Sequence, residues 1–162
     1  MAKPHPDILS ALTAGIQAEV AAYVFYLEAS KKVEDKKLAK PLTNLAGEER
    51  KHFQILDRQY DSLIRSEKWI STADILKQEG LPEIGEDMRN EHKDLVNDVG
   101  RMNTDREILA MALKLEEDAR DTYVDASKRA DTTEAKDTFA QLIKFEQGHV
   151  NYINSLLESL DD

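Results

Sequence analysis

The sequence contains Glu49-Arg50-Lys51-His52, and 97 residues later it contains Glu146-Gln147-Gly148-His149. A glutamate and a histidine three positions apart lie on the same face of an α-helix, where both side chains can reach one metal ion. A single Glu-x-x-His motif arises easily by chance in a helical protein rich in glutamate. Two copies at matching places indicate an internal repeat, and this repeat decides the fold.

The repeat extends well beyond the two motifs. A shift of 97 residues aligns the two ends of the chain without a gap, and residues 71–104 lie outside the alignment. The aligned pairs are Glu19 and Glu116, Tyr26 and Tyr123, Leu45 and Leu142, Glu49 and Glu146, and His52 and His149. The chain is therefore predicted to consist of two similar halves joined by a different segment.

Both halves show the periodicity of α-helices, because apolar residues recur every three or four positions. The predicted long helices run from about 6 to 33, from Pro41 to about 67–69, from Thr104 onward, and from Thr132 to about 160. Short polar turns within each half make the pairs of helices antiparallel. We therefore expect two helical hairpins, over about 6–69 and 105–160.

The segment 71–104 differs from both hairpins in composition. It holds three of the six glycines, one proline and many charges, and it predicts short helices around 74–78 and 86–99. A link of this length lets the second and third long helices run parallel, as in ferritin-like folds. We therefore expect one all-α domain over 1–162, a ferritin-like four-helix bundle with a long crossover insert.

The composition excludes several classes of protein. Of 162 residues, 41% are hydrophobic and 33% charged, and only six Gly and four Pro are present, too few for the turns of a β-barrel or sandwich. The net charge of -10 repels phosphate backbones, so we expect no nucleic-acid partner. Because the chain has no cysteine, disulfides, thiolate catalysis, Zn–Cys sites and Fe–S clusters are excluded.

The sequence also predicts where in the cell the protein is located. No apolar run approaches the roughly 18–20 residues that a membrane span needs. The start, Met1-Ala2-Lys3-Pro4-His5-Pro6-Asp7, lacks the apolar centre of a signal peptide. We expect a cytoplasmic protein without a membrane partner.

Six polar residues of the repeat lie on the apolar faces of the predicted helices: Glu19, Glu49, His52, Glu116, Glu146 and His149. Burial of four ionised carboxylates without a counter-charge would cost more than the roughly 5–15 kcal/mol that stabilises a domain. Either their pKa values rise or cations lie among them. One Glu from each of two helices, with Glu-x-x-His from each of the other two, is the ligand set of di-iron and di-manganese bundles. We therefore predict a dinuclear metal site.

Other polar and aromatic residues have simpler explanations. Tyr26 and Tyr123 follow the upstream glutamates by two helical turns, and they either hydrogen-bond a ligand carboxylate or fill the core; the sequence leaves both open. Glu48 lies beside the apolar face and is expected to be solvated. The residues expected at the surface are His5, His92, Glu117 and Asp118. Trp69 is expected to close one end of the bundle.

These residues resemble the rubrerythrin di-iron domain of the ferritin-like superfamily. The resemblance is carried by Glu19 with Tyr26, Glu48-Glu49-Arg50-Lys51-His52, Glu116 with Tyr123, and Glu146-Gln147-Gly148-His149. It covers both hairpins and implies a four-helix bundle with a non-haem di-iron centre. By this resemblance Glu49 and Glu146 bridge the metals, Glu19 and Glu116 are terminal carboxylates, and His52 and His149 each bind one metal.

The sequence departs from rubrerythrins in two respects. Rubrerythrins carry a C-terminal rubredoxin domain that delivers electrons, whereas this chain has no cysteine and ends soon after His149. We therefore expect the electron donor to be a separate protein. Rubrerythrins also have an extra glutamate one turn beyond the third-helix ligand, where this sequence has Ala119. The site is thus expected to be a symmetric set of six ligands.

Three functions follow from the ligand set and the resemblance. In the first, a redox enzyme reduces hydrogen peroxide or O2 at two iron ions, with manganese or zinc as alternative metals. In the second, the same centre oxidises Fe(II) for storage or transfer. In the third, the metal is purely structural in an interaction module. The structural role ranks third because a carboxylate-rich site leaves room for exogenous oxygen ligands. Storage ranks below the redox enzyme because a shell of many subunits would have to accommodate the 34-residue insert (71–104). A homodimer is the expected assembly.

Overall fold

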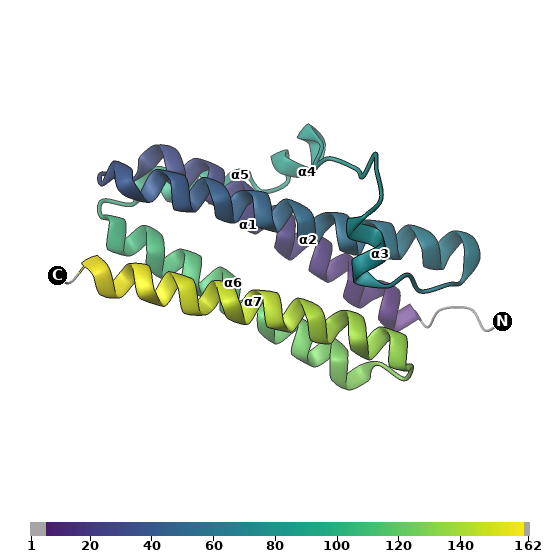
Figure 1. Cartoon of the computed structure of the whole chain (residues 1–162). Coiled ribbons are helices and arrows are strands. Elements are labelled where there is room, and N and C mark those ends of the chain that lie inside the picture. The colour runs from purple at the N-terminus through teal and green to yellow at the C-terminus, as the bar shows by residue number, and fades with distance from the viewer. Residues whose placement is uncertain (1–5, 161–162) are drawn as a thin grey trace.

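Four long helices form a bundle of two layers, one above the other in Figure 1. The computed structural model describes residues 6–160, and these contain helices and no strand. The upper layer consists of α1 (Pro6–Lys32) and α2 (Ala39–Ser66), and the lower layer consists of α6 (Asp105–Arg129) and α7 (Thr133–Leu160). The prediction of an all-α four-helix bundle is confirmed.

Each layer is an antiparallel hairpin of two helices. In Figure 1, α2 and α6 run in the same direction, and the segment between them returns along the length of the molecule. The parallel course of these two helices is the one that the long link predicts. As a result, α1 begins at one end of the bundle and α7 ends at the other.

Backbone and side-chain caps set the ends of the long helices. Thr104 Oγ1 accepts a backbone N–H at the start of α6 (3.1 Å), and Thr132 Oγ1 does the same at the start of α7 (3.2 Å). The helix α2 ends at Ser66, and the next residue, Glu67, caps it in the left-handed conformation with φ 57°. Asp35 caps the single 3₁₀ turn η1 (Lys36–Leu38), which joins α1 to α2. These boundaries agree with the sequence pattern to within a few residues.

The segment between the hairpins packs on the outside of the first layer. Its helices are α3 (Thr72–Leu76), α4 (Glu86–Asn90) and α5 (Lys93–Arg101). Gln54 of α2 donates a hydrogen bond to the carbonyl of Pro82 (3.1 Å). A small apolar cluster joins this segment to α1 and α2, and its buried members are Val20, Val24, Phe53 and Ile84. The segment therefore covers the α1–α2 hairpin and leaves the space between the two layers to the long helices.

The helix α1 is more apolar than the sequence pattern suggested. By length and composition it passes the test for a membrane span, with a mean hydropathy of 1.5 over an 18-residue window. However, 56% of that window is buried inside the protein, and its buried face carries Glu19. This apolar character is that of a core helix, because α1 packs against both α2 and α6.

The apolar core is divided by a layer of polar residues. One apolar cluster includes Phe25, Leu42, Leu109 and Ile153, and the other includes Leu12, Leu56, Phe139 and Leu142. Between these clusters, each long helix places its repeated Glu or Glu-x-x-His residues. The partly buried Trp69 packs against the second cluster. The polar layer is thus enclosed by apolar packing on both sides along the bundle.

Candidate metal centre

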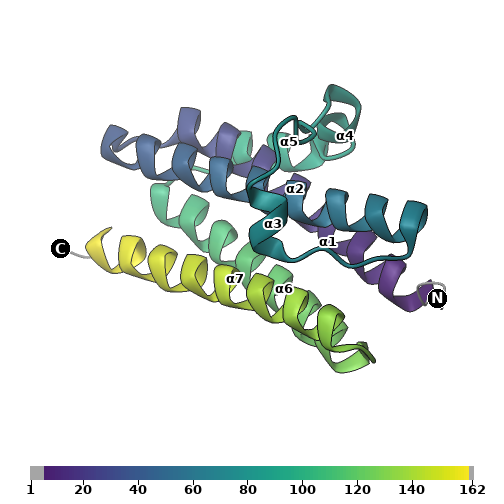
Figure 2. The same cartoon turned by 45° about the vertical axis from the view of Figure 1, so that its right-hand side comes forward.

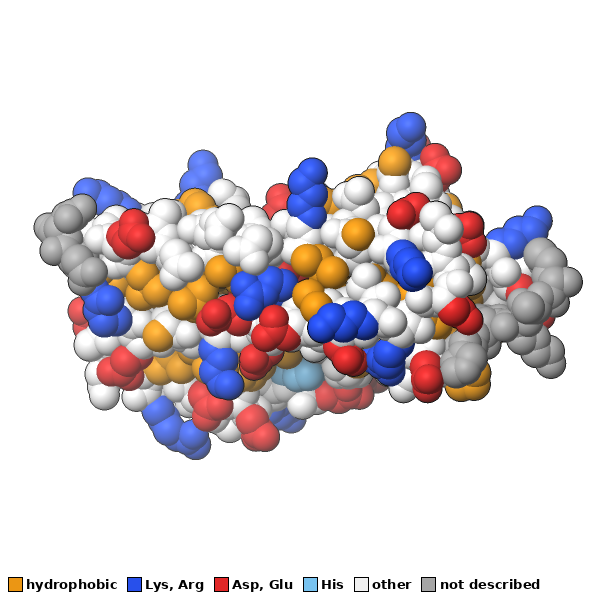
Figure 3. Space-filling view, turned by 90° about the horizontal axis from the view of Figure 1, so that it is seen from below, with side chains coloured by type: hydrophobic (Ala, Val, Ile, Leu, Met, Phe, Trp, Pro, Cys, Tyr) orange, Lys and Arg blue, Asp and Glu red, His pale blue; other side chains and the backbone are white. Residues whose placement is uncertain are grey.

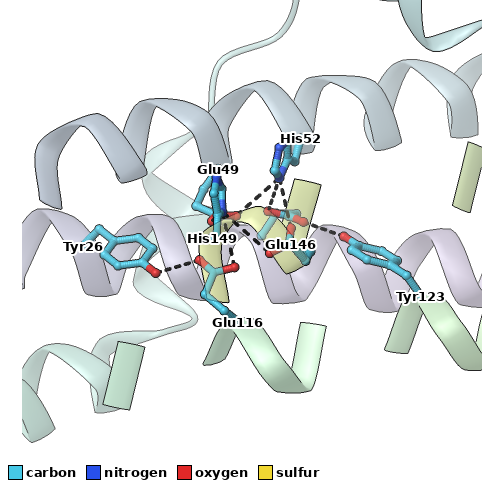
Figure 4. A network of polar contacts seen from close by, with 8 residues as sticks. Tyr26, Glu49, His52, Glu116, Tyr123, Glu146 and His149 are labelled. Carbon is cyan, nitrogen blue, oxygen red and sulfur yellow. Dashed lines mark hydrogen bonds and ion pairs between the residues drawn. The ribbon is translucent and has the colours of Figure 1, made fainter. Parts of the chain in front are cut away.

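The six predicted ligands come together at the centre of the bundle, although they lie on four helices. Figure 4 labels all of them except Glu19. They are Glu19 of α1, Glu49 and His52 of α2, Glu116 of α6, and Glu146 and His149 of α7. The four glutamates are at most 1% exposed. Each Glu-x-x-His pair faces the centre together because three residues make nearly one helical turn.

The donor atoms form two similar half-sites. In the first, His52 Nδ1 lies near three carboxylate oxygens, those of Glu146 (3.0 Å), Glu19 (3.4 Å) and Glu49 (3.7 Å). In the second, His149 Nδ1 lies near three more, those of Glu49 (3.0 Å), Glu116 (3.4 Å) and Glu146 (3.8 Å). The two sets of distances match closely because the two halves of the chain repeat.

Glu49 and Glu146 are shared between the half-sites. Oε1 of Glu49 faces His149, while its Oε2 faces His52. Oε1 of Glu146 faces His52, while its Oε2 faces His149. A carboxylate that presents one oxygen to each half-site can bridge two cations, whereas the other two glutamates face a single histidine each.

Tyr26 and Tyr123 bind the two outer glutamates in a crossed pattern. Tyr26 of α1 donates a hydrogen bond to Oε1 of Glu116 on α6 (2.6 Å), and Tyr123 of α6 donates to Oε1 of Glu19 on α1 (2.6 Å). Figure 4 shows the two tyrosines at opposite ends of the cluster. Each phenol holds one carboxylate oxygen and leaves the other facing a histidine. This contact decides between the two roles that the sequence leaves open for the tyrosines.

The outer and central carboxyls differ in their ionisation. Burial alone would raise the pKa of Glu19, but the charge of His52 and hydrogen bonds within the cluster lower it to about 2. Burial is likewise outweighed at Glu116, where hydrogen bonds within the cluster hold the pKa well below its usual value. Burial and neighbouring carboxylates raise the pKa values of Glu49 and Glu146 well above their usual value. The outer carboxyls therefore ionise more readily than the central ones.

The tyrosines remain hydrogen-bond donors over the ordinary pH range. Burial and the charge of Glu116 raise the pKa of Tyr26 well above 10.0. Burial and the charge of Glu19 do the same to the pKa of Tyr123. Both phenols thus stay protonated and keep the outer carboxylates in place.

The cluster offers more buried acceptors than it has donors to satisfy them. Among the residues described, several buried atoms of the cluster form no hydrogen bond, although ion-pair distances of 3.0–3.8 Å separate them from their neighbours. They include Oε2 of Glu19, Oε1 of Glu49, Oε2 of Glu116, Oε2 of Glu146 and Nδ1 of His149. Each such atom costs about 1–3 kcal/mol when it is left unpaired. Ligand atoms of Glu49, His52, Glu146 and His149 lie within 4.8 Å of one another. These residues fit a metal site, because carboxylates and imidazoles suit iron, manganese and zinc.

Of the residues predicted to lie outside the site, those that the structure describes form no hydrogen bond or ion pair with the donor atoms. Glu48 and Asp118 are exposed, and Glu117 is half-buried. His92 is half-buried and its ring contacts a side chain of α1. His5 lies outside the described residues.

Three further residues contribute to the packing of the helices that carry the site and were not identified from the sequence. Phe145 stacks on His52, with ring centroids 5.1 Å apart and planes inclined by 13°. Gln59 is fully buried, and its side-chain amide donates to the carbonyl of Ile70 just before the insert (2.8 Å) and to Thr138 of α7 (3.2 Å). Gly15 makes room for Tyr123, since a Cβ at Gly15 would lie 2.8 Å from Cε1 of that ring. Gln59 and Gly15 did carry a signal, because each interrupts the apolar face of its helix.

Replacement of Tyr26 by phenylalanine is expected to lower the free energy of unfolding of the metal-free protein by about 1–3 kcal/mol, because a buried ionised carboxylate loses its donor. Urea denaturation measures this change. The matched control is Tyr23→Phe, one turn away on α1 and only half-buried, for which we expect a change within about 0.5 kcal/mol. Equal losses in the two variants would show that the bond to Glu116 contributes nothing.

The fold and the sequence are both similar to known proteins. The chain matches the family model of rubrerythrin over residues 10–95 and 107–162. Its fold is similar to that of a hypothetical protein from Pyrococcus furiosus, with a TM-score of 0.65 and 20% identity over 93% of this chain and 88% of that chain. No curated protein matches the sequence. Because the family model spans most of the chain and all six residues of the centre, the protein belongs to the rubrerythrin family.

Proposed function

We propose that this protein is a non-haem di-iron oxidoreductase that reduces hydrogen peroxide, with O2 as the alternative oxidant. The observation that supports it best is the pair of half-sites, each with one histidine and one outer glutamate, joined by two shared glutamates. Membership of the rubrerythrin family favours di-iron redox chemistry over other metal functions. Iron is preferred to manganese or zinc on the same ground.

The residues that would hold each ion follow from the contacts. One ion would bind His52 and Glu19, the other would bind His149 and Glu116, and both would bind the two central glutamates. Two bound ferrous ions would supply the two electrons that, with two protons, convert one hydrogen peroxide into two waters. The charge of two divalent ions also balances four carboxylates.

The protein prepares this site in three ways. The tyrosines hold one oxygen of each outer glutamate and so restrict that carboxylate to one orientation. A carboxylate binds a cation only in its ionised form, so metal binding is coupled to the release of any proton that the cluster holds. The two apolar clusters on either side keep water out of the bundle along its axis.

Access to the centre is easiest beside His149. Its side chain is 13% exposed, compared with 4% for His52. Figure 3 views the molecule from the side of α6 and α7, where acidic and basic side chains lie close together on the surface. A molecule as small as peroxide could enter there without displacing a helix.

Stopped-flow mixing tests the proposal. The protein is loaded anaerobically with two Fe(II) per chain and mixed with hydrogen peroxide or with O2, and the absorbance of the oxidised iron is followed. We expect oxidation by peroxide to be at least about tenfold faster, a barrier difference of about 1.4 kcal/mol. Faster oxidation by O2 would favour oxidase or ferroxidase chemistry. If no iron is bound or oxidised, the proposal is wrong.

The second candidate function is the oxidation of Fe(II) for storage or transfer. Ala119 favours it, since this residue lies in the apolar core where the family resemblance implies an additional glutamate. The centre is therefore a symmetric set without a seventh carboxylate. Storage requires a shell of many subunits, so a dimer in solution would favour peroxide reduction and a large assembly would favour storage. A centre that binds metal without turnover would be structural.

A further inference from the structure

A cavity of about 600 Å³ lies between the start of the insert and α7. In Figure 2, α3 lies in front of α2 and above α7, and residues of α3 and α7 line the cavity. Its volume is within the roughly 300–1,000 Å³ that is typical of small-molecule sites. Its wall is mainly apolar with a few polar groups, and it includes Trp69, Ile70, Leu76, Thr138, Gln141 and Phe145.

Phe145 connects the cavity with the metal centre. This side chain lines the cavity and also stacks on His52, at 5.1 Å between ring centroids. His52 in turn stacks on His149, at 5.3 Å and with planes inclined by 17°. One aromatic ring therefore separates the cavity from the donor atoms, and three stacked rings extend from the cavity into both half-sites.

The chemistry of the wall restricts what the cavity can bind. Glu134 and Asp137 are exposed at its wall, and none of the described residues that line it is basic. With a net charge of -10 on the whole chain, an anionic ligand would be repelled. Trp69 and Phe145 provide aromatic surface for a planar ring, while Gln141 can hydrogen-bond to polar ring edges. The cavity thus fits an uncharged planar ring system with polar edges.

We propose that this cavity binds an uncharged flavin ring, which in its reduced form donates electrons to the metal centre. The redox role rests on the proposed function, because a site that reduces peroxide must regain two electrons in each turnover. A dihydroflavin carries two electrons and two protons. One dihydroflavin and one hydrogen peroxide therefore yield oxidised flavin and two waters, and no other reactant is needed. The ring would lie against Phe145, with His52 directly behind it.

Binding is tested first on the metal-free protein, so that the result does not depend on the redox function. Trp69 is the only tryptophan in the chain and lies in the cavity wall, so its emission reports the occupant. Titration with riboflavin is expected to quench this emission with saturation, and riboflavin 5′-phosphate is expected to bind more weakly because of the acidic wall. Absence of saturable quenching would overturn the proposal. A change with protein concentration alone would also overturn it, since the occupant would then be a second copy of the chain.

Two variants localise the binding. Ala140 is an exposed residue of the cavity wall, and Ala140→Phe is expected to fill the cavity and weaken riboflavin binding by at least about tenfold. The matched control is Tyr152→Leu on the same helix, at a side chain that is 42% exposed and outside the cavity wall. It is expected to leave binding unchanged. Equal quenching in both variants would place the flavin elsewhere and overturn the proposal.

The electron transfer is tested on iron-loaded, oxidised protein. Under anaerobic conditions, Phe145→Leu is expected to slow reduction by dihydroriboflavin at least about tenfold at equal iron content, a barrier difference of about 1.4 kcal/mol. Its reduction by dithionite is expected to match that of the wild type. Equal rates with dihydroriboflavin in the two proteins would overturn the role of Phe145. Loss of peroxide reactivity in the wild type, with Trp69 quenching intact, would instead refute the proposed function and leave the binding site established.

Discussion

Replacement of Glu49 by alanine is expected to abolish binding of at least one metal ion. One oxygen of Glu49 faces His52 and the other faces His149, so the substitution removes a ligand from each half-site. The wild type is expected to bind about two ions per chain, as other carboxylate bundles of this ligand set do. The variant is expected to bind one or none, measured by anaerobic titration with Fe(II) and metal analysis. Rapid oxidation by peroxide should disappear with the lost ion.

Glu48→Ala is the matched control for this experiment. Glu48 precedes Glu49 in the chain, has the same charge, and forms an exposed ion pair with Lys51 (3.6 Å). Such surface pairs contribute about 0–1 kcal/mol, so the control should stay folded with both ions bound. Circular dichroism checks that the Glu49 variant is folded before its metal content is compared. If both variants bind two ions equally, the assignment of Glu49 as a shared ligand is wrong.

Replacement of Gly15 by alanine is expected to destabilise the protein, although alanine is the better helix former by about 1 kcal/mol. The new methyl group would lie 2.8 Å from Cε1 of Tyr123 and 3.1 Å from Cδ1 of Leu56. Tyr123 cannot move freely, because it is fully buried and its hydroxyl is bonded to Glu19 (2.6 Å). Such overpacking costs about 1–3 kcal/mol. We expect a net loss of about 1 kcal/mol or more in urea denaturation, together with weaker metal binding.

Gly47→Ala provides the control with the opposite expected sign. Gly47 lies within α2, and a Cβ there would have no atom within 4 Å. The substitution should therefore stabilise the protein by about 0.5–1 kcal/mol through helix propensity. If Gly15→Ala stabilises the protein as much as Gly47→Ala does, the ring of Tyr123 is not held against α1.

The two halves of the repeat differ in the space available at one pair of equivalent helix positions. Ala112 is the residue aligned with Gly15, and it is fully buried. The second hairpin therefore accommodates a methyl group at a position where the first hairpin has no room for one. A sequence repeat predicts equivalent positions, but equivalent positions do not need equal volumes.

Much of the site could be predicted because the period of an α-helix determines which side chains of a segment point in the same direction. Glu49 and His52 share one face of a helix whatever that helix packs against, and so do Glu146 and His149. The apolar residues around them indicate that this face is buried, and a buried carboxylate needs a partner. The repeat then implies a second, similar hairpin, and the long segment 71–104 permits parallel middle helices. These are local properties, so the sequence alone determines the bundle, its connections and the six candidate ligands.

The contacts between helices were decided by the tertiary structure. Tyr26 binds Glu116 of the other hairpin rather than Glu19 of its own helix, because the phenol reaches across the bundle. The stacking of Phe145 on His52 likewise depends on how α7 is rotated against α2. Sequence spacing determines which residues share a helix face. The separation and rotation of packed helices determine which residues meet across the interface, and these depend on the packing of the whole core.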